Sequence, residues 1–197
     1  MDDDEGMDDA RLTGRLLVAT PMLGDPNFRR TVVLIVEDEP EQGTLGVVLN
    51  RPTEVPVARV LEPWEDLATG PAVVFKGGPV AVESALALAR AASDEEPLGW
   101  HALNGTPLMS RIGLVDLDAP PEVLAAEVEC LRVFAGYAGW GTGQLQSEID
   151  EGAWYVVSAE PSDAFADHPD RLWSSVLRRQ GGDVALVATF PDDPAQN

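Results

Sequence analysis

The residues best suited to chemistry form a glycine-rich segment between an aromatic stretch and an amphipathic one. Gly136, Gly139, Gly141 and Gly143 follow one another closely there. Glycine lets backbone amides approach a ligand, and the N-terminus of a helix attracts anions. The pattern predicts a strand that turns sharply into a helix near 142–149. It also indicates a site for a small anion or a peptide carboxylate at that junction.

This segment differs from the known phosphate-binding loops. A P-loop needs Gly-Lys-Ser/Thr, and no lysine follows these glycines; a dinucleotide fingerprint needs a different glycine spacing from that of Gly139-Trp-Gly-Thr-Gly143. The structural alternative is that the glycines only permit a tight turn and close packing. Similarly, Tyr137 and Trp140 either contact a ligand or partner, or fold back to cap the core.

Two further turns end predicted strands, and they can converge with the glycine-rich segment on one rim. They are Asn50-Arg51-Pro52 and Gly77-Gly78-Pro79. Arg51 is then the natural anion contact, because a guanidinium binds a carboxylate or phosphate with two hydrogen bonds. The alternative is two ordinary turns, with Arg51 paired to an acid. The candidate ligand or partner contacts are Asn50, Arg51, Gly77, Gly78, Tyr137, Gly139, Trp140, Gly141, Thr142 and Gly143.

The residues usually found in catalytic and metal sites are sparse. His101, His168 and Cys130 have no metal-ligand spacing, and no Gly-x-Ser-x-Gly elbow occurs in the sequence. Apolar neighbours predict that Cys130 is a buried, inert thiol. We therefore predict no catalytic residue, no metal and no cofactor, and the sequence favours a protein that is not an enzyme.

Charge sets the second constraint. The chain has 34 acidic and 13 basic residues, a formal net charge of −21, and no basic stripe beyond the isolated pairs Arg29-Arg30 and Arg178-Arg179. This balance argues against direct contact with DNA or RNA, which needs clustered lysine and arginine. The single cysteine, the acidic N-terminus and the lack of a long apolar run predict a cytoplasmic protein without membrane contact.

Hydrophobic patterning predicts runs of strands rather than strict alternation with helices, which favours an α+β fold. The short link after residue 36 predicts a hairpin. The composition predicts a disordered acidic tail over 1–10, one domain over 11–190 and a frayed end over 191–197. Strands are expected at 12–18, 31–36, 44–49, 72–75, 85–89, 108–115, 154–158 and 183–190, and helices at 57–68, 120–131, 142–149 and 169–180.

Three short motifs follow one another along the chain: Leu49-Asn-Arg-Pro52, Gly77-Gly-Pro-Val80 and Gly136-Tyr-Ala-Gly-Trp140. Their order and spacing resemble the YqgE/AlgH family of bacterial proteins, and the resemblance covers nearly all of residues 12–181. It implies a single-domain α+β fold with a mixed, partly split β-sheet packed with several helices. Members of that family carry a transcriptional-regulator label, and the family has no established reaction or cofactor.

These observations together predict a non-catalytic binding or regulatory protein that acts through contacts with a protein partner of unknown identity. The alternative is a sensor or enzyme that binds a small anion at the glycine-rich turn, 136–143. The family's regulator label points to transcription, but the net charge argues against direct DNA binding.

Overall fold

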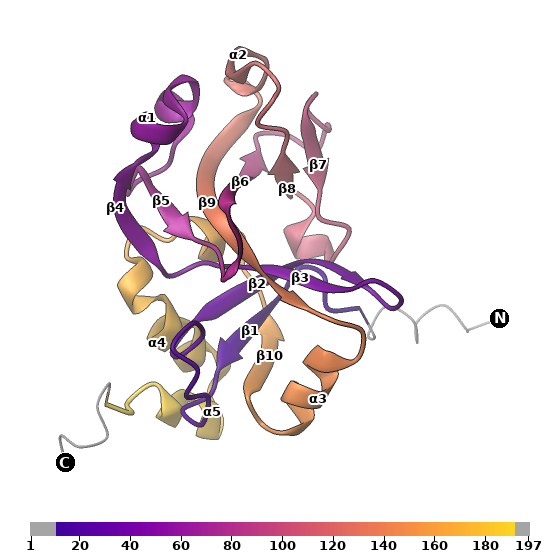
Figure 1. Cartoon of the computed structure of the whole chain (residues 1–197), viewed down its shortest axis with the longest axis vertical. Coiled ribbons are helices and arrows are strands. Elements are labelled where there is room, and N and C mark those ends of the chain that lie inside the picture. The colour runs from indigo at the N-terminus through magenta and orange to yellow at the C-terminus, as the bar shows by residue number, and fades with distance from the viewer. Residues whose placement is uncertain (1–10, 192–197) are drawn as a thin grey trace.

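A computed structural model describes residues 11–191, in which ten strands form one curled sheet (Figure 1). The strands are β1 (Arg15–Ala19), β2 (Val32–Glu39), β3 (Gly43–Val48), β4 (Pro52–Pro56), β5 (Val73–Lys76), β6 (Val80–Ala91), β7 (Trp100–Ala102), β8 (Ile112–Val115), β9 (Val128–Trp140) and β10 (Trp154–Ser158). The predicted acidic tail over 1–10 and the end of the chain from 192 lie outside the described residues.

Strand β9 joins the two halves of this sheet. On one side, β10, β1, β2 and β3 follow one another as antiparallel neighbours, and β3 pairs with the end of β9. On the other side, β6 pairs along most of β9 and leads to β8 and β7. Strand β5 runs parallel to β9, with Phe75 opposite Phe134, and pairs with β4. The sheet is therefore mixed and partly split, and the predicted α+β fold is confirmed.

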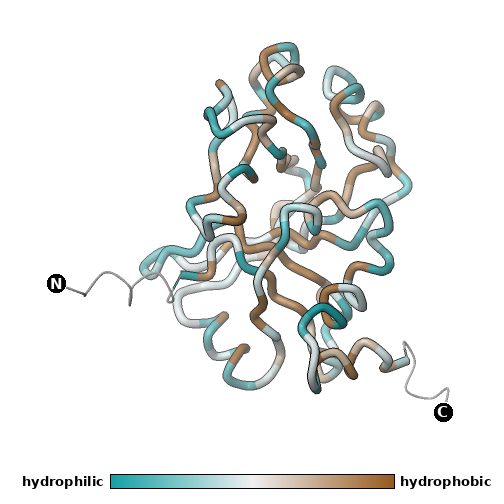
Figure 2. Tube along the Cα trace, turned by 180° about the vertical axis from the view of Figure 1, so that it is seen from behind, coloured by the Kyte–Doolittle hydropathy of each residue, from teal (hydrophilic) through white to brown (hydrophobic). Residues whose placement is uncertain are grey.

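Apolar side chains are buried on both faces of the sheet, as expected for strands covered on both sides. In β9 the side chains alternate: Leu131 and Val133 belong to a cluster around Trp64, whereas Phe134 packs in the larger cluster that contains Trp173. Figure 2 shows hydrophobic segments along the strands in the middle of the molecule and hydrophilic ones at peripheral turns. The predicted hairpin is confirmed by the antiparallel pairing of β2 with β3.

A buried arginine on β9 connects this strand to two other segments of the chain through hydrogen bonds. Arg132 is 1% exposed and lies over the Phe75 ring, with its guanidinium carbon 4.4 Å from the ring centroid. It donates hydrogen bonds to the carbonyl oxygens of Gly70, Ala164 and Ala166 at 2.8, 3.2 and 3.3 Å. Burial lowers the pKa of Arg132 to about 10, so the side chain stays charged at neutral pH.

The helices are short except for α4, which packs against β1 with α5 beside it (Figure 1). The predicted helix over 169–180 is confirmed, and Gly181, with φ +72°, ends it. The helices are α1 (Val57–Val60), α2 (Pro121–Leu124), α3 (Gln144–Asp150), α4 (Pro169–Gln180) and α5 (Gly182–Val187), with 3-10 turns η1 (Glu62–Leu67), η2 (Pro107–Met109) and η3 (Asp163–Phe165).

Several predicted elements are wrong in type or length. The expected strand at 108–115 covers only Ile112–Val115, because Pro107–Met109 form the 3-10 turn η2. The expected helix at 57–68 is split into α1 and η1, because Pro63 in the first turn of η1 cannot donate a backbone hydrogen bond. The expected helix at 120–131 ends at Leu124, since the residues from Val128 onward pair with β6 instead. The expected strand at 183–190 is the helix α5, because a short apolar run does not distinguish the two structures.

Within residues 11–191 no helix is both long enough and apolar enough to cross a membrane.

Candidate functional site

The loop before β2 positions two arginines. The carbonyl oxygen of Asp25 accepts hydrogen bonds from the amides of Phe28 and Arg29 at 3.0 and 2.8 Å, which forms a tight turn. Arg30 then adopts a positive φ of 55°. Asn50, two residues after the end of β3, fixes this loop: its Nδ2 donates to the carbonyl oxygen of Arg30 at 2.9 Å, and its Oδ1 accepts from the amide of Val32 at 2.9 Å.

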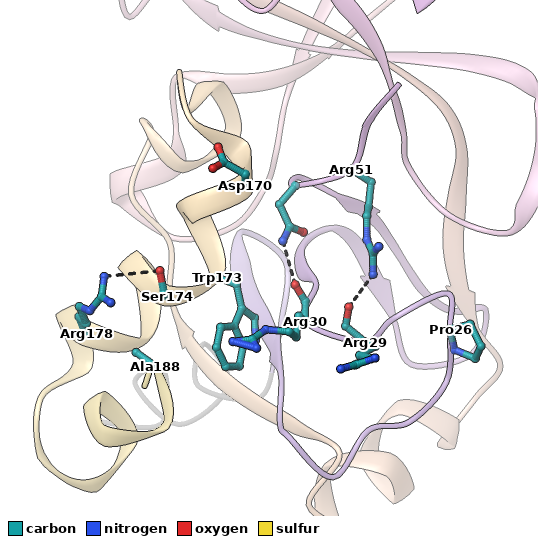
Figure 3. Close-up of a pocket in the computed structure, with 10 residues that line it drawn as sticks. Pro26, Arg29, Arg30, Arg51, Asp170, Trp173, Ser174, Arg178 and Ala188 are labelled. Carbon is teal, nitrogen blue, oxygen red and sulfur yellow. Dashed lines mark hydrogen bonds between the residues drawn. The ribbon is translucent and has the colours of Figure 1, made fainter. Parts of the chain in front are cut away.

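These residues face α4 across an open hollow of about 710 Å³, which we call the arginine hollow (Figure 3). It is lined by Pro26, Arg29, Arg30, Asn50, Arg51, Asp170, Trp173, Ser174, Arg178 and Ala188. Figure 3 shows Arg178 on one side and Arg29 and Arg51 on the other, with Arg30 and Trp173 between them. Four arginines from three separate segments therefore meet in a chain of net charge −21.

Arg30 forms the floor of the arginine hollow together with Trp173. Its guanidinium carbon lies 4.1 Å from the centroid of the Trp173 ring, a cation–π contact. Both terminal nitrogens of Arg30 donate to the carbonyl oxygen of Phe190, at 3.2 and 2.8 Å. Trp173 is itself held by a 2.9 Å hydrogen bond from its Nε1 to the carbonyl oxygen of Ala19. This pair is therefore fixed by packing and hydrogen bonds.

The other three arginines of the hollow, Arg29, Arg51 and Arg178, form no ion pair with any residue of the described part of the chain. Arg51 donates to the carbonyl oxygen of Arg29 at 2.5 Å, and Arg178 lies 3.5 Å from the hydroxyl of Ser174. Asp170 is the acid among the lining residues, and its carboxylate is 3.9 Å from the guanidinium of Arg171. Positive charge therefore dominates the arginine hollow.

A second, smaller hollow of about 40 Å³ adjoins the first, and the two share Pro26 and Arg51. We call it the lysine hollow, because Lys76 lines it together with Asn27, Val48, Gly78 and Pro79. Lys76 is exposed, and its amide donates to the carbonyl oxygen of Arg51 at 2.8 Å, so backbone pairing holds the two basic residues side by side.

The two glycines next to Lys76 are required by close backbone contact with β9. The amide of Gly77 donates to the carbonyl oxygen of Ala135 at 2.9 Å. A β-carbon on Gly77 would lie 2.3 Å from the carbonyl oxygen of Gly136, and one on Gly78 would lie 2.1 Å from the carbonyl carbon of Tyr137. The Gly77-Gly78 turn is therefore packed against the glycine-rich segment through its backbone.

The aromatic part of the glycine-rich segment lies elsewhere. Tyr137, Gly139 and Trp140 line a separate hollow of about 390 Å³, together with residues of β2 and β3. Trp140 is only 5% exposed, and its Nε1 donates to a carboxylate oxygen of Glu148 at 2.9 Å. Most of its indole surface therefore belongs to the core cluster that also contains Trp154.

The remaining glycine-rich residues surround the start of α3. The amide of Gly141 donates to the side-chain oxygen of Gln144 at 3.0 Å, and the hydroxyl of Thr142 lies 3.4 Å from the carbonyl oxygen of Glu41. Gly143 precedes the helix with φ +73°. The strand-to-helix turn predicted here is confirmed. The hollow next to Thr142 and Gly143, of about 110 Å³, is lined by acids, Asp38 and Glu39.

The structure thus brings together only part of the predicted set. Asn50, Arg51 and Gly78 lie along the two adjoining hollows, whereas Trp140 lines a different one. Sequence reasoning missed Arg29, Arg30, Arg178 and Trp173 as lining residues. The sequence did contain a signal for the arginines, namely the pairs Arg29-Arg30 and Arg178-Arg179. The two pairs look isolated because they are far apart in the sequence, and only the fold brings them together.

Metal-ligating and nucleophilic residues are scattered in the described part of the chain. No group of three or more histidine, cysteine or acidic side chains with metal-binding geometry occurs among residues 11–191. His101 lies at the surface, 3.7 Å from a carboxylate oxygen of Glu96. Cys130 is half-buried rather than buried, and it packs against the main core cluster.

Proteins of one family match nearly the whole chain. A family model described as AlgH-like (DUF179) matches residues 16–185. A UPF0301 protein of Streptomyces coelicolor is 60% identical over 190 residues, which cover 94% of this chain and 95% of that protein. A UPF0301 protein of Mycobacterium tuberculosis is 48% identical over 184 residues, covering 93% and 90% of the two chains.

Solved structures agree with the sequence comparison. A crystal structure of a protein from Corynebacterium diphtheriae matches with a TM-score of 0.84 and 33% identity, and covers 96% of this chain and 100% of that one. The solution structure of the AlgH protein from Pseudomonas aeruginosa matches with a TM-score of 0.65 and 27% identity, and covers 93% and 96%.

Proposed function

This chain belongs to the AlgH-like family, and we propose that it is a non-catalytic binding or regulatory protein that recognises an anionic group in the arginine hollow. The group is a carboxylate or a phosphate. The observation that carries this proposal is the gathering of Arg29, Arg30, Arg51 and Arg178 around one hollow in a strongly acidic chain. In the cytoplasm, the location expected from the single cysteine, both groups are abundant on proteins and metabolites.

The charge balance of the hollow supports an anionic ligand. Like charges held close together repel one another, and a bound anion relieves that repulsion. Arginine also suits this role better than lysine, because its planar fork of donors matches a carboxylate or phosphate with two parallel hydrogen bonds. Arg29, Arg51 and Arg178 have no ion-pair partner within residues 11–191, so an anion from outside would be their charge partner.

The glycine-rich turn is a weaker candidate for the same ligand. The amide of Gly141 is already bonded to Gln144, and α3 is a short helix of seven residues. Asp38 and Glu39 line the hollow beside Thr142, and their charge would repel an anion. We therefore assign anion recognition to the arginine hollow, and we propose only a structural role for the glycine-rich turn.

Titration calorimetry with inorganic phosphate and with succinate tests the proposal. Both anions are expected to bind the wild-type protein. Arg178→Ala is the cleanest variant, because Arg178 is exposed and its described contact is the hydroxyl of Ser174. We expect it to weaken binding about threefold to tenfold, and Arg51→Ala combined with Arg178→Ala to weaken it more than tenfold.

Arg59→Ala is the matched control for this experiment. Arg59 is exposed on α1 and lines none of the hollows described above, so its loss changes the net charge by the same amount without touching the site. The control is expected to bind like wild type. Binding of neither anion, or equal binding by the control and the double variant, would overturn the proposal.

A further inference from the structure

We propose that the ligand is an extended acidic segment of a partner protein, which lies along the arginine hollow and continues past Arg51 to Lys76. This inference rests on the proposed function and names the class of partner for the same site. It starts from the continuity of the two hollows, which share Pro26 and Arg51.

The size of the arginine hollow favours a ligand larger than one ion. Its volume of about 710 Å³ falls within the roughly 300–1,000 Å³ of pockets that hold a whole small molecule. Five of the 13 basic residues of the chain line the two hollows: Arg29, Arg30, Arg51, Lys76 and Arg178. One phosphate or carboxylate can contact only some of them. A chain with several carboxylates can contact the four that form no ion pair within residues 11–191, which are Arg29, Arg51, Lys76 and Arg178.

Lys76 is placed to receive the next acid of such a segment. Its side chain is exposed, and it forms no ion pair with another residue of the described part of the chain. The lysine hollow holds about 40 Å³, which is room for only a few water molecules at about 10–15 Å³ each. A carboxylate fits this space, but a nucleotide base does not.

The aromatic residue of the arginine hollow favours an acidic peptide over single-stranded nucleic acid. Proteins that bind single strands stack bases on exposed aromatic faces. Trp173, the aromatic residue that lines this hollow, is 4% exposed, and the guanidinium of Arg30 lies over its ring. That face is therefore unavailable to a base, whereas the arginine forks remain suited to carboxylates.

Fluorescence anisotropy with labelled hexaglutamate tests this inference on the full-length chain. Wild type is expected to bind hexaglutamate more tightly than it binds labelled hexaglutamine or a labelled six-nucleotide oligothymidine. Lys76→Ala is expected to weaken hexaglutamate binding about threefold to fivefold, as for the loss of one exposed ion pair. The same variant should leave the affinity for inorganic phosphate unchanged, and Arg59→Ala should match wild type for both.

The outcomes separate this inference from the proposed function. If phosphate binds and depends on Arg51 and Arg178, but hexaglutamate binding is the same in Lys76→Ala and Arg59→Ala, the extended-segment inference is wrong and the anion site stands. Tighter binding of the oligothymidine than of hexaglutamate would also overturn the inference. If neither phosphate nor succinate binds, both proposals fall.

Discussion

Glu148 is the residue whose loss we expect to loosen the glycine-rich turn most strongly. Its Oε2 accepts hydrogen bonds from the Nε1 atoms of Trp140 and Trp154, at 2.9 Å each. Both indoles are buried, at 5% and 4% exposed. A hydrogen bond to a charged acceptor stabilises a protein by about 1.5–3 kcal/mol, so two give about 3–6 kcal/mol. Because Glu148 is half-buried and partly hydrated, we expect Glu148→Ala to lower the free energy of unfolding by about 2–4 kcal/mol.

Urea-induced unfolding, followed by tryptophan fluorescence, measures this loss directly because two of the indoles are the bonded partners. Glu148→Gln is the matched control: its amide oxygen still accepts from Trp140 and Trp154, but without the charge. We expect about half the loss of the alanine variant. An alanine variant within about 0.5 kcal/mol of wild type would refute the reasoning, as would equal losses for both variants.

Three further substitutions test other parts of the molecule. Gly77→Ala should lower the free energy of unfolding by about 2 kcal/mol or more, because its β-carbon would meet a carbonyl oxygen at 2.3 Å; Gly24→Ala, with nothing within 4 Å, should be neutral in the same urea assay. Arg132→Met should cost about 2–4 kcal/mol, because three backbone carbonyl oxygens lose their donor, and an unchanged urea midpoint would contradict this. The hydrogen bond from Arg90 lowers the pKa of Glu129. Wild type should therefore be more stable than Glu129→Gln at neutral pH, and this difference should vanish as the pH falls through the lowered pKa. A difference that persists in acid would contradict the assignment.

Local pattern was sufficient to predict the regular parts of this fold. The helix α4 follows from apolar residues at helical spacing, with Gly181 as its end, and the β2–β3 hairpin follows from two apolar runs joined by a short polar link. The error at 120–131 arose because tertiary pairing decides the outcome there. Val128 and the residues after it suit a helix face by spacing, yet they pair with β6, and that long-range contact is invisible in a local window.

The candidate site shows the same division between local and long-range information. Arg51 was predicted as an anion contact from its turn and its side-chain chemistry, and it lies where the two hollows meet. The assembly of Arg29 and Arg30 with Arg178 depends on how α4 packs beside β1, which no local pattern records. For Trp140 the sequence left two alternatives, contact with a ligand or partner and folding back to cap the core. Trp140 is buried, and its hydrogen bond to Glu148 depends on how α3 packs beside the end of β9.

The net charge of the chain is −21, yet a ligand in the arginine hollow is surrounded by basic residues. At physiological ionic strength a charge is screened over about 8 Å, so a ligand in the hollow responds mainly to the basic residues that touch it. A long nucleic acid would extend beyond the basic residues of the hollow over the surface of a chain whose net charge is −21, and it would release few counterions there. The proposed acidic segment would be short enough to contact only the basic residues that line the two hollows, from Arg178 to Lys76. The overall acidity therefore argues against long polyanions as partners but not against short ones. Both kinds of ligand are negatively charged, and they differ in how much of the protein surface they would cover.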